Sequence, residues 1–304
     1  MRSDSTVPAR VEGGYPLSRL TTVGIGGPAR WFGRPETVAE LDRMLVWARH
    51  QELRVLAIGL GSNVLAADSG LDALVVRLTG ELAAVEIGGD KLAAGGGAPN
   101  AVCLHRARGA GLGGMEFACA IPGTAGGGMR MNAGAYGRDW ADIVERALVV
   151  SADGTEWRSR DELEFAYRHS ALRAGDIVAQ VEFRLTSREP AEIKSAVAEL
   201  NALRKASQPT NRRTFGSVFK NPDHELGAGA MLDACGLKGH VVGGARISPR
   251  HANFIENVDG ALAADAIALM AEARRRAFET YGVALEREVE LLGELELPPV
   301  GANG

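Results

Sequence analysis

Glycine content is the feature that most constrains this chain. It has 39 glycines in 304 residues, nearly twice the average share of about 7 per cent, and 19 of them fall between Gly59 and Gly137. Glycine weakens helices and strands, so a chain retains it where the backbone needs a positive φ or must approach a ligand closely. No Gly-X-Y period is present, which excludes a collagen-like chain. The cluster therefore predicts a globular protein with a ligand site lined by backbone.

Charge, cysteine count and hydropathy exclude several classes of function. The net charge is −4, from 34 basic and 38 acidic residues, and this mild acidity argues against a nucleic-acid partner. The cysteines, Cys103, Cys119 and Cys235, are odd in number and form no CxxC pair, as expected for a reducing cytoplasm. The longest stretch without charge or histidine is about 13 residues, too short to span a bilayer. We expect a cytoplasmic protein with no metal site, no membrane association and no obligate protein partner.

Hydrophobic periodicity predicts a mixed α and β chain. Helices are expected over 36–51, 99–108, 191–206, 228–235 and 262–281, and strands over 55–58, 74–78, 253–257 and 285–292. Between 143 and 186 the apolar residues alternate around a turn at Asp153-Gly154, which is typical of an antiparallel hairpin. We expect two glycine-bearing α/β subdomains, 1–86 and 87–190, followed by a smaller α+β domain, 191–304.

Two glycine loops remain as candidate binding sites once common motifs are excluded. The chain has no Walker A loop, no GxSxG elbow and no HExxH pair. The glycines of 59–61 are followed by Val64 where a Rossmann fingerprint needs its third glycine. Successive amides in the loops 59–63 and 121–127 can form anion-binding nests, and two such loops can hold the two phosphates of one dinucleotide. Each loop taken alone is equally compatible with a simple tight turn.

Motifs along nearly the whole chain carry a resemblance to one family. They are LTTVGIGG (20–27), GLGSNVL (59–65), GLGGMEFACAIPGTAGGGMRMNAGAYG (111–137), YRHS (167–170), GSVFKNP (216–222), AGAMLDACGLKG (228–239), ANFI (252–255) and LEREVELLG (285–293). In this order they resemble the UDP-N-acetylenolpyruvoylglucosamine reductase family. Only 48 residues separate Arg168 from Ser217, which resembles the shorter form of the family that lacks an extra substrate-domain loop.

The resemblance implies a fold and a cofactor. The fold is the FAD-binding fold of the vanillyl-alcohol-oxidase type, with two α/β subdomains, plus a C-terminal α+β substrate domain. FAD is bound without a covalent link. The implied contacts to its diphosphate are Gly59, Leu60, Gly61, Ser62, Asn63, Ile121, Pro122, Gly123, Thr124, Gly126 and Gly127. Asn132 and Gly134 are implied to lie near the flavin.

The resemblance also implies a reaction of peptidoglycan precursor synthesis. NADPH reduces FAD, and the reduced flavin passes hydride to the enolpyruvyl double bond of a UDP-sugar substrate, giving UDP-N-acetylmuramate. The developing enolate needs a cation or acid at its carboxylate and a proton donor at the neighbouring carbon. Arg168 and Glu288 match the family's stabilising residues, with Glu288 kept protonated by burial and the nearby anion. Ser217 matches the proton donor.

Four further residues are weaker candidates for substrate contact: Tyr167, Arg204, Lys220 and Asn221. His169 is expected to point away from Arg168 if the segment is extended, and has no assigned role. Two other functions stay open at this stage. One is a different flavin oxidoreductase of the same fold, such as a small-alcohol oxidase. The other is a nucleotide-binding or flavin-binding relative without catalytic activity.

Overall fold

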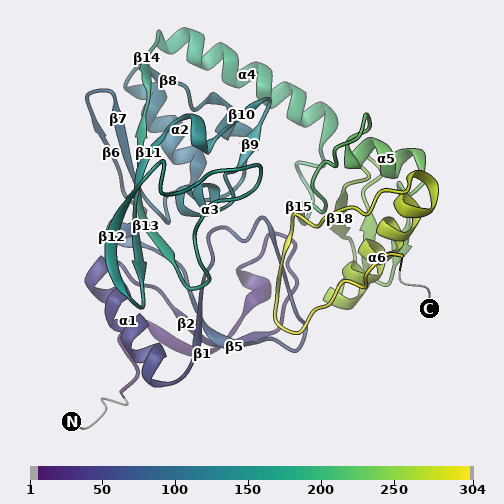
Figure 1. The fold of residues 1–304 in the computed structure, drawn as a ribbon, viewed down its shortest axis with the longest axis horizontal. Coiled ribbons are helices and arrows are strands. Elements are labelled where there is room, and N and C mark those ends of the chain that lie inside the picture. The colour runs from purple at the N-terminus through teal and green to yellow at the C-terminus, as the bar shows by residue number, and fades with distance from the viewer. Residues whose placement is uncertain (1–5, 302–304) are drawn as a thin grey trace. The chain divides into compact units, whose positions relative to one another are not determined.

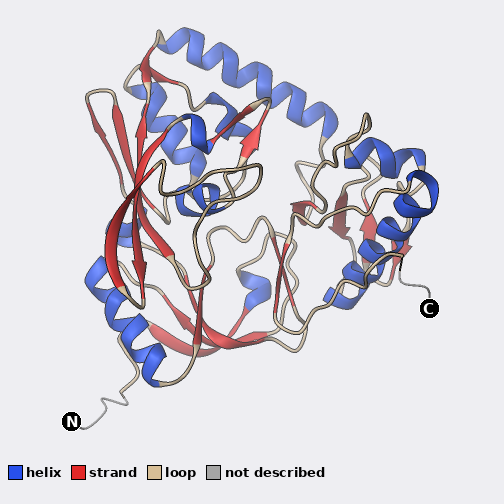
Figure 2. Ribbon diagram, in the orientation of Figure 1, coloured by secondary structure: helices blue, strands red, loops and turns tan. Residues whose placement is uncertain are grey.

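A computed structural model describes residues 6–301 of the chain (Figures 1 and 2). These residues form two compact units. Unit 1 comprises residues 6–14, 30–60 and 72–204, and unit 2 comprises 15–29, 61–71 and 205–301. Within the described residues, none of the helices combines the length and the apolar character needed to cross a membrane. The predicted three-part division, with cuts near 86 and 190, stays a prediction.

The N-terminal sheet has the strand order β1-β2-β5-β3, and β3 runs parallel to β5. Its strands are β1 (Val11–Pro16), β2 (Pro28–Gly33), β3 (Arg54–Ala57) and β5 (Leu71–Val76). Helix α1 (Val38–His50) begins where Thr37 accepts a hydrogen bond from the Glu40 amide, 3.2 Å away. Its buried residues Leu41 and Met44 share a core cluster with Leu74. The predicted helix over 36–51 is therefore confirmed, because its apolar stripe has a sheet to pack on.

Unit 1 contains a five-stranded antiparallel sheet of order β12-β11-β13-β7-β6. Its strands are β6 (Val85–Gly88), β7 (Lys91–Gly95), β11 (Val144–Ser151), β12 (Gly154–Ser159) and β13 (Ile177–Arg184). Ser151 pairs with Gly154 across the turn, which confirms the predicted hairpin. Trp140 and Phe183 are fully buried in the core that this sheet shares with α2 (Asn100–Gly109) and α3 (Ala125–Arg130).

Shorter elements connect these layers. They are η2 (Gly80–Ala83), β8 (Leu112–Gly113), η3 (Glu116–Ala120), β9 (Gly134–Ala135), β10 (Arg138–Asp139), η4 (Trp140–Asp142) and β14 (Thr186–Ser187). The 18-residue helix α4 (Pro190–Ser207) follows β14. Strand β8 pairs with β14, and β9 pairs with β10. Helix α4 confirms the prediction over 191–206.

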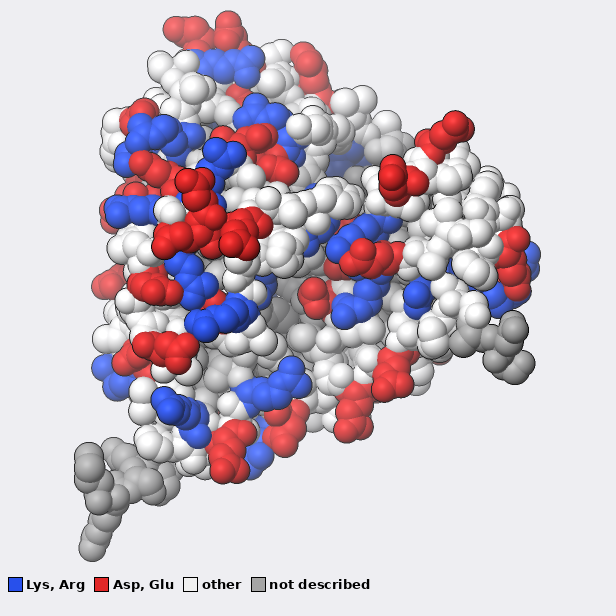
Figure 3. All heavy atoms as spheres, in the orientation of Figure 1, with Lys and Arg blue, Asp and Glu red and all other residues white. Residues whose placement is uncertain are grey.

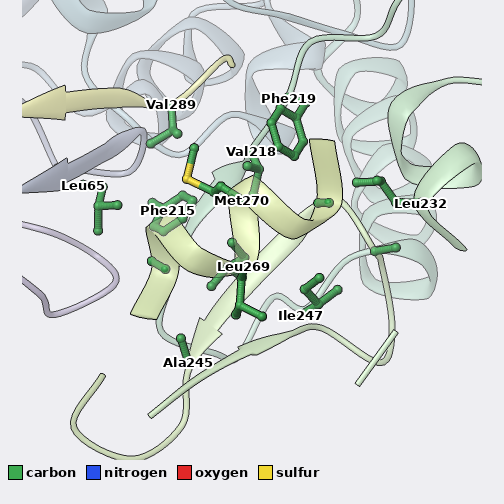
Figure 4. Close-up of a cluster of buried hydrophobic side chains, with 14 of the residues drawn as sticks. Leu65, Phe215, Val218, Phe219, Leu232, Ala245, Ile247, Leu269, Met270 and Val289 are labelled. Carbon is green, nitrogen blue, oxygen red and sulfur yellow. The ribbon is translucent and has the colours of Figure 1, made fainter. Parts of the chain in front are cut away.

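Unit 2 is built on a four-stranded antiparallel sheet of order β15-β18-β17-β16 and on helix α6. The elements of this part are η1 (Leu17–Arg19), β4 (Val64–Ala66), β15 (Thr214–Ser217), α5 (Ala228–Ala234), β16 (Val241–Val242), β17 (Ala245–Ile247), β18 (Phe254–Asn257), α6 (Ala263–Tyr281) and β19 (Glu290–Leu292). Leu269 and Met270 of α6 lie among Phe215, Val218 and Ile247 in the buried cluster of Figure 4. The helices predicted near 228–235 and 262–281 are confirmed.

Two local predictions differ from the structure. The glycine loop predicted over 121–127 continues into helix α3, which covers residues 125–130 although three of the six are glycine. The helix forms because its glycines allow close packing against neighbouring segments. The last strand covers Glu290–Leu292 alone, so the strand predicted over 285–292 is wrong for residues 285–289. Those residues join the chain at the isolated bridge between Phe219 and Arg287 and through backbone hydrogen bonds such as that from Glu288 N to Val218 O.

Candidate active site

The loop 121–127 is backed by the segment 96–100 of unit 1. The amides of Ala125 and Gly126 donate to the carbonyls of Ala98 and Gly96, at 2.8 and 2.9 Å, and the Asn100 amide donates to Gly123 O at 3.0 Å. A Cβ on Gly126 would lie 2.9 Å from Gly96 O. Two amides that the anion nest was expected to use are therefore committed to the backing segment, since buried N–H groups need partners. The Gly95-Gly96-Gly97 run has a different cause, because a Cβ on these glycines would meet Leu82 O, Val178 O and Leu78 O at 2.3, 1.8 and 2.3 Å.

The glycine turn at 59 meets this loop within unit 1. A Cβ on Gly59 would lie 2.6 Å from Thr124 Oγ1, so only glycine fits here. Thr124 is buried and caps α3, with its Oγ1 3.4 Å from the Gly127 amide. Gly127 is the exposed glycine of this turn. The close packing of a glycine turn on a capped, glycine-rich helix start has the small residues and hydroxyl that a diphosphate cradle requires.

Asn132 organises the polypeptide around Arg168 rather than presenting its amide. Its backbone has a positive φ of 39°. Its Nδ2 donates to Asp139 Oδ2 at 3.1 Å and to Ala166 O at 3.0 Å, and its Oδ1 accepts from the Ala141 amide at 2.9 Å. All these bonds are internal, and the side chain is buried. Asn132 therefore ties the turn that carries Arg168 to the β9–β10 hairpin.

Arg168 lies in a two-residue turn with a left-handed backbone, φ 55°. Ala166 and His169 close the turn by exchanging backbone hydrogen bonds of 3.1 Å. The segment is therefore not extended, and the alternation expected for His169 does not apply. The guanidinium donates to Gly134 O at 3.0 Å and lies over the Tyr167 ring at 4.8 Å. These contacts direct Arg168 toward the Asn132–Gly134 segment.

Ser217 follows a bulge in unit 2. Thr214 pairs with Glu256 and Ser217 with Phe254, and the register shifts between the two pairs. Gly216 in the shifted stretch has φ 80°, a conformation that favours glycine. The apolar neighbours of this stretch, Phe215 and Val218, are buried in the core of Figure 4. Ser217 is half-buried, and its position is anchored on both sides by the core.

Glu288 is joined through its backbone to Val218, the residue after Ser217, in the same unit. The Glu288 amide donates to Val218 O at 2.8 Å, which joins the segment of Glu288 to the residue after Ser217. Asn63 Nδ2 donates to Glu288 O at 3.1 Å, and Asn63 O accepts from the Glu290 amide at 3.0 Å. Strand β4, which follows Asn63, pairs in parallel with β19. The structure thus brings together Asn63, Ser217 and Glu288, which the sequence places far apart.

Asn253 is a site residue to which the sequence analysis gave no role. Its Oδ1 accepts from the Phe219 amide at 2.9 Å, its Nδ2 donates to Phe219 O at 2.8 Å, and its carbonyl accepts from the Val218 amide at 2.9 Å. It is almost fully buried, at 3 per cent exposure. Asn253 holds the chain immediately after Ser217. A buried amide beside an apolar strand was the available signal, since such groups normally have structural partners.

The weaker candidates have protein partners of their own. Lys220 Nζ pairs with Glu286 Oε1 at 2.6 Å, and Asn221 Oδ1 accepts from the Ala228 amide at the start of α5, at 3.1 Å. Arg204 Nη1 donates to Cys119 O at 3.2 Å. Burial raises the pKa of the Cys119 thiol, and the nearby Arg204 charge partly opposes this. Tyr167 is half exposed, at 52 per cent.

The surface carries mixed charge. On the face in Figure 3, acidic and basic side chains are interspersed rather than gathered by sign. Arg184 illustrates the pattern, since it pairs with both Asp90 and Glu145 at 2.8 Å. Among residues 6–301, no group of three or more His, Cys, Asp and Glu side chains is arranged to hold a metal ion.

Family models match two parts of this chain. The model described as "UDP-N-acetylenolpyruvoylglucosamine reductase, C-terminal domain" matches residues 208–292, and that described as "FAD binding domain" matches 30–160. The chain is 42 per cent identical over 295 residues to UDP-N-acetylenolpyruvoylglucosamine reductase 2 of Symbiobacterium thermophilum, covering 96 per cent of each. The chain belongs to the UDP-N-acetylenolpyruvoylglucosamine reductase family.

Two further relatives support membership in this reductase family. The reductase of Anaeromyxobacter dehalogenans is 43 per cent identical over 284 residues, covering 93 per cent of this chain and 85 per cent of that protein. The crystal structure of the reductase from Thermus caldophilus aligns with a TM-score of 0.82 at 37 per cent identity, covering 93 per cent of this chain and 99 per cent of that one. The predicted FAD-binding fold with its C-terminal α+β domain is confirmed. The expectation of an FAD-containing oxidoreductase is confirmed as well.

Proposed function

We propose that this chain reduces the enolpyruvyl group of UDP-N-acetyl-3-O-(1-carboxyvinyl)-glucosamine to UDP-N-acetylmuramate, with NADPH as the reductant, in peptidoglycan precursor synthesis. The observation that carries the proposal is the hydrogen bond from the Glu288 amide to Val218 O, which brings a carboxyl residue beside a hydroxyl residue. Membership in the reductase family supports the substrate. We propose a cytoplasmic location, where NADPH and UDP-sugars are available.

The cofactor supplies one part of the chemistry, and the side chains supply the other. When bound, FAD carries hydride from NADPH to the enolpyruvyl double bond. Hydride at the terminal carbon leaves negative charge on the carbon next to the carboxylate, delocalised as an enolate. The residues must therefore stabilise that charge and deliver one proton to that carbon.

Ser217 and Glu288 divide these tasks in the proposal. Ser217 gives its hydroxyl proton to the carbon next to the carboxylate. A serine hydroxyl is a weak acid in water, but the enolate is a strong base, and a short fixed transfer distance favours the step. Glu288 is the proposed partner that stabilises the enolate. The bulge at Gly216 and the bonds of Asn253 to Phe219 restrict the motion of this segment.

Arg168 is proposed to bind the substrate carboxylate. A guanidinium stays charged at any physiological pH and binds both oxygens of a carboxylate with a planar fork. Its bond to Gly134 O and its contact with the Tyr167 ring hold the guanidinium beside the Asn132–Gly134 segment. The left-handed backbone of the turn sets the direction in which the Arg168 side chain projects.

The proposed cofactor loops remain 59–63 and 121–127, with Asn132 and Gly134 near the flavin. The internal bonds of Asn132 favour a supporting role for its side chain, and leave Gly134 as the closer candidate. Tyr167, Arg204, Lys220 and Asn221 remain proposed substrate contacts. Their protein partners mean that substrate must share or displace existing bonds.

Anaerobic spectroscopy tests the function directly. Purified protein is mixed with NADPH and then with the enolpyruvyl UDP-sugar while flavin absorbance is followed. We expect bleaching by NADPH and rapid recovery on addition of substrate. Recovery of flavin absorbance with oxygen but not with substrate would identify an oxidase of the same fold. A flavin that NADPH does not reduce would indicate a flavin-binding protein without catalytic activity.

The role of Ser217 is tested by Ser217→Ala. We expect flavin reduction by NADPH to be retained, because the hydroxyl takes no part in that half-reaction. Reoxidation by substrate should slow by about 10²- to 10⁴-fold, the usual contribution of a general acid. Stopped-flow measurement of each half-reaction checks this. An equal loss in both half-reactions would show that the serine is structural.

A further inference from the structure

The motif LTTVGIGG, residues 20–27, has no role in the reaction proposed above, yet it packs on the cofactor loop within unit 2. The Thr22 amide donates to Gly61 O at 3.0 Å. A Cβ on Gly61 would lie 2.1 Å from Leu20 O and 2.8 Å from Thr21 Cα. Residues 20–22 therefore form the surface against which the glycine turn at Gly61 lies.

The Thr22 side chain also reaches the strand that carries Ser217. Its Oγ1 donates to Thr214 O at 2.6 Å and lies 3.3 Å from Gly61 O. One hydroxyl proton cannot make two full hydrogen bonds, so the shorter contact to Thr214 dominates. Thr214 is the first residue of β15, and Ser217 is its last. Thr22 thus binds the loop through its amide and the strand through its hydroxyl.

The same loop and strand approach each other a second time. A Cβ on Gly216 would lie 3.2 Å from Ser62 O. The residues from Gly61 to Ser62 are therefore joined to β15 near its start, through Thr22, and lie close to it near its end, beside Gly216. A strand of four residues has little independent rigidity. The loop contact is well placed to decide where its last residue lies.

We propose that Thr22 is a positioning residue that fixes the Gly61–Asn63 loop to β15, so that the loop which receives FAD also sets the position of Ser217. The inference rests on the proposed function of Ser217. It adds a coupling between cofactor binding and the proton donor, carried by one hydroxyl outside the reacting groups. Thr22 is exposed, so its hydroxyl is not needed to fill or satisfy the core.

Thr21 provides a matched control in the neighbouring position. Its Oγ1 donates to Ile25 O at 2.9 Å, a bond that stays inside the motif. Thr21 is buried, at 7 per cent exposure. Thr21→Val therefore removes one hydroxyl hydrogen bond from the same segment, a bond that involves neither Gly61 nor Thr214. A purely structural effect should be larger at Thr21 than at Thr22.

The experiment compares Thr22→Val, Thr22→Ser and Thr21→Val in the full-length FAD-loaded protein. For Thr22→Val we expect reoxidation by the enolpyruvyl UDP-sugar to slow about 10- to 100-fold, as for a small misplacement of a reacting group. Flavin reduction by NADPH should be retained. The dissociation constant for FAD, from flavin fluorescence with apoprotein, should rise about three- to tenfold. Thr22→Ser should restore both, and Thr21→Val should lower the thermal midpoint without separating the two half-reactions.

Three results would overturn the proposal: unchanged reoxidation in Thr22→Val, equal slowing in Thr21→Val, or failure of Thr22→Ser to restore the rate. If Thr22→Val does not fold, Thr22→Ala against Thr22→Ser decides the same question. If the wild-type protein itself is not reoxidised by the UDP-sugar, the proposed function fails. The FAD dissociation constants then still show whether the Thr22 hydroxyl supports the loop.

Discussion

At the residue scale, Gly216 connects backbone geometry to chemistry. Its φ of 80° lies in the left-handed region, and it occupies the bulge directly before Ser217. A side chain there would be strained by about 1–2 kcal/mol and would approach Ser62 O. Relief of either strain requires movement of the chain next to Ser217. The glycine is therefore expected to matter for catalysis as well as for stability.

Gly216→Ala should lower the free energy of unfolding by about 1–2 kcal/mol and slow flavin reoxidation by substrate. Gly89→Ala is the control, since Gly89 also has a left-handed φ, of 62°, but no heavy atom within 4 Å of a Cβ. Denaturant unfolding should show similar losses in both variants. Reoxidation as fast in Gly216→Ala as in Gly89→Ala would contradict the link to Ser217.

At the element scale, helix α3 forms against its own sequence preference. Three consecutive glycines, 126–128, disfavour a helix by about 1 kcal/mol each relative to alanine. Two of them are required by packing, because a Cβ on Gly126 would meet Gly96 O and one on Gly128 would lie 1.9 Å from Trp140 Nε1. The helix is therefore stabilised by the Thr124 cap and by its packing contacts. No local pattern in the sequence reveals those contacts.

Alanine should have opposite effects on stability at the exposed Gly127 and at the buried Gly128 of α3. Gly128→Ala should destabilise the protein by about 1–3 kcal/mol through overpacking against Trp140. Gly127→Ala meets only an ordinary 3.5 Å contact and should stabilise the apoprotein by about 0.5–1 kcal/mol. If the turn lies against the FAD diphosphate, Gly127→Ala should nonetheless bind FAD more weakly. Thermal unfolding and FAD titration together check this, and unchanged FAD affinity would remove Gly127 from the cofactor site.

At the scale of the whole molecule, cofactor binding and folding should be coupled. A ligand that binds only the folded chain raises its stability by RT ln(1 + [L]/Kd), about 2.7 kcal/mol when free FAD is 100 times Kd. Removal of FAD should therefore lower the thermal midpoint, and graded FAD should restore it along this relation. Differential scanning fluorimetry at several FAD concentrations measures it. NADPH alone at equal concentration is the control, and an equal shift with NADPH would argue against a specific FAD effect.

Local sequence patterns were sufficient to predict several of the regular elements and the family. Helices α1, α4 and α6 and the β11–β12 hairpin carry strong periodic or turn patterns, so local preference and tertiary packing agree. The ordered motifs were sufficient to identify the reductase family and its FAD.

Which motifs meet in space follows from long-range contacts rather than from local patterns. Asn63 holds Glu288, Thr22 joins Gly61 to Thr214, and Asn132 braces the turn of Arg168. The first two of these contacts join residues about two hundred positions apart in sequence, and none of the three follows from a local pattern. The physical reason is that periodicity records how a segment buries its own apolar face. Periodicity carries no information about the distant backbone groups to which a polar side chain forms hydrogen bonds.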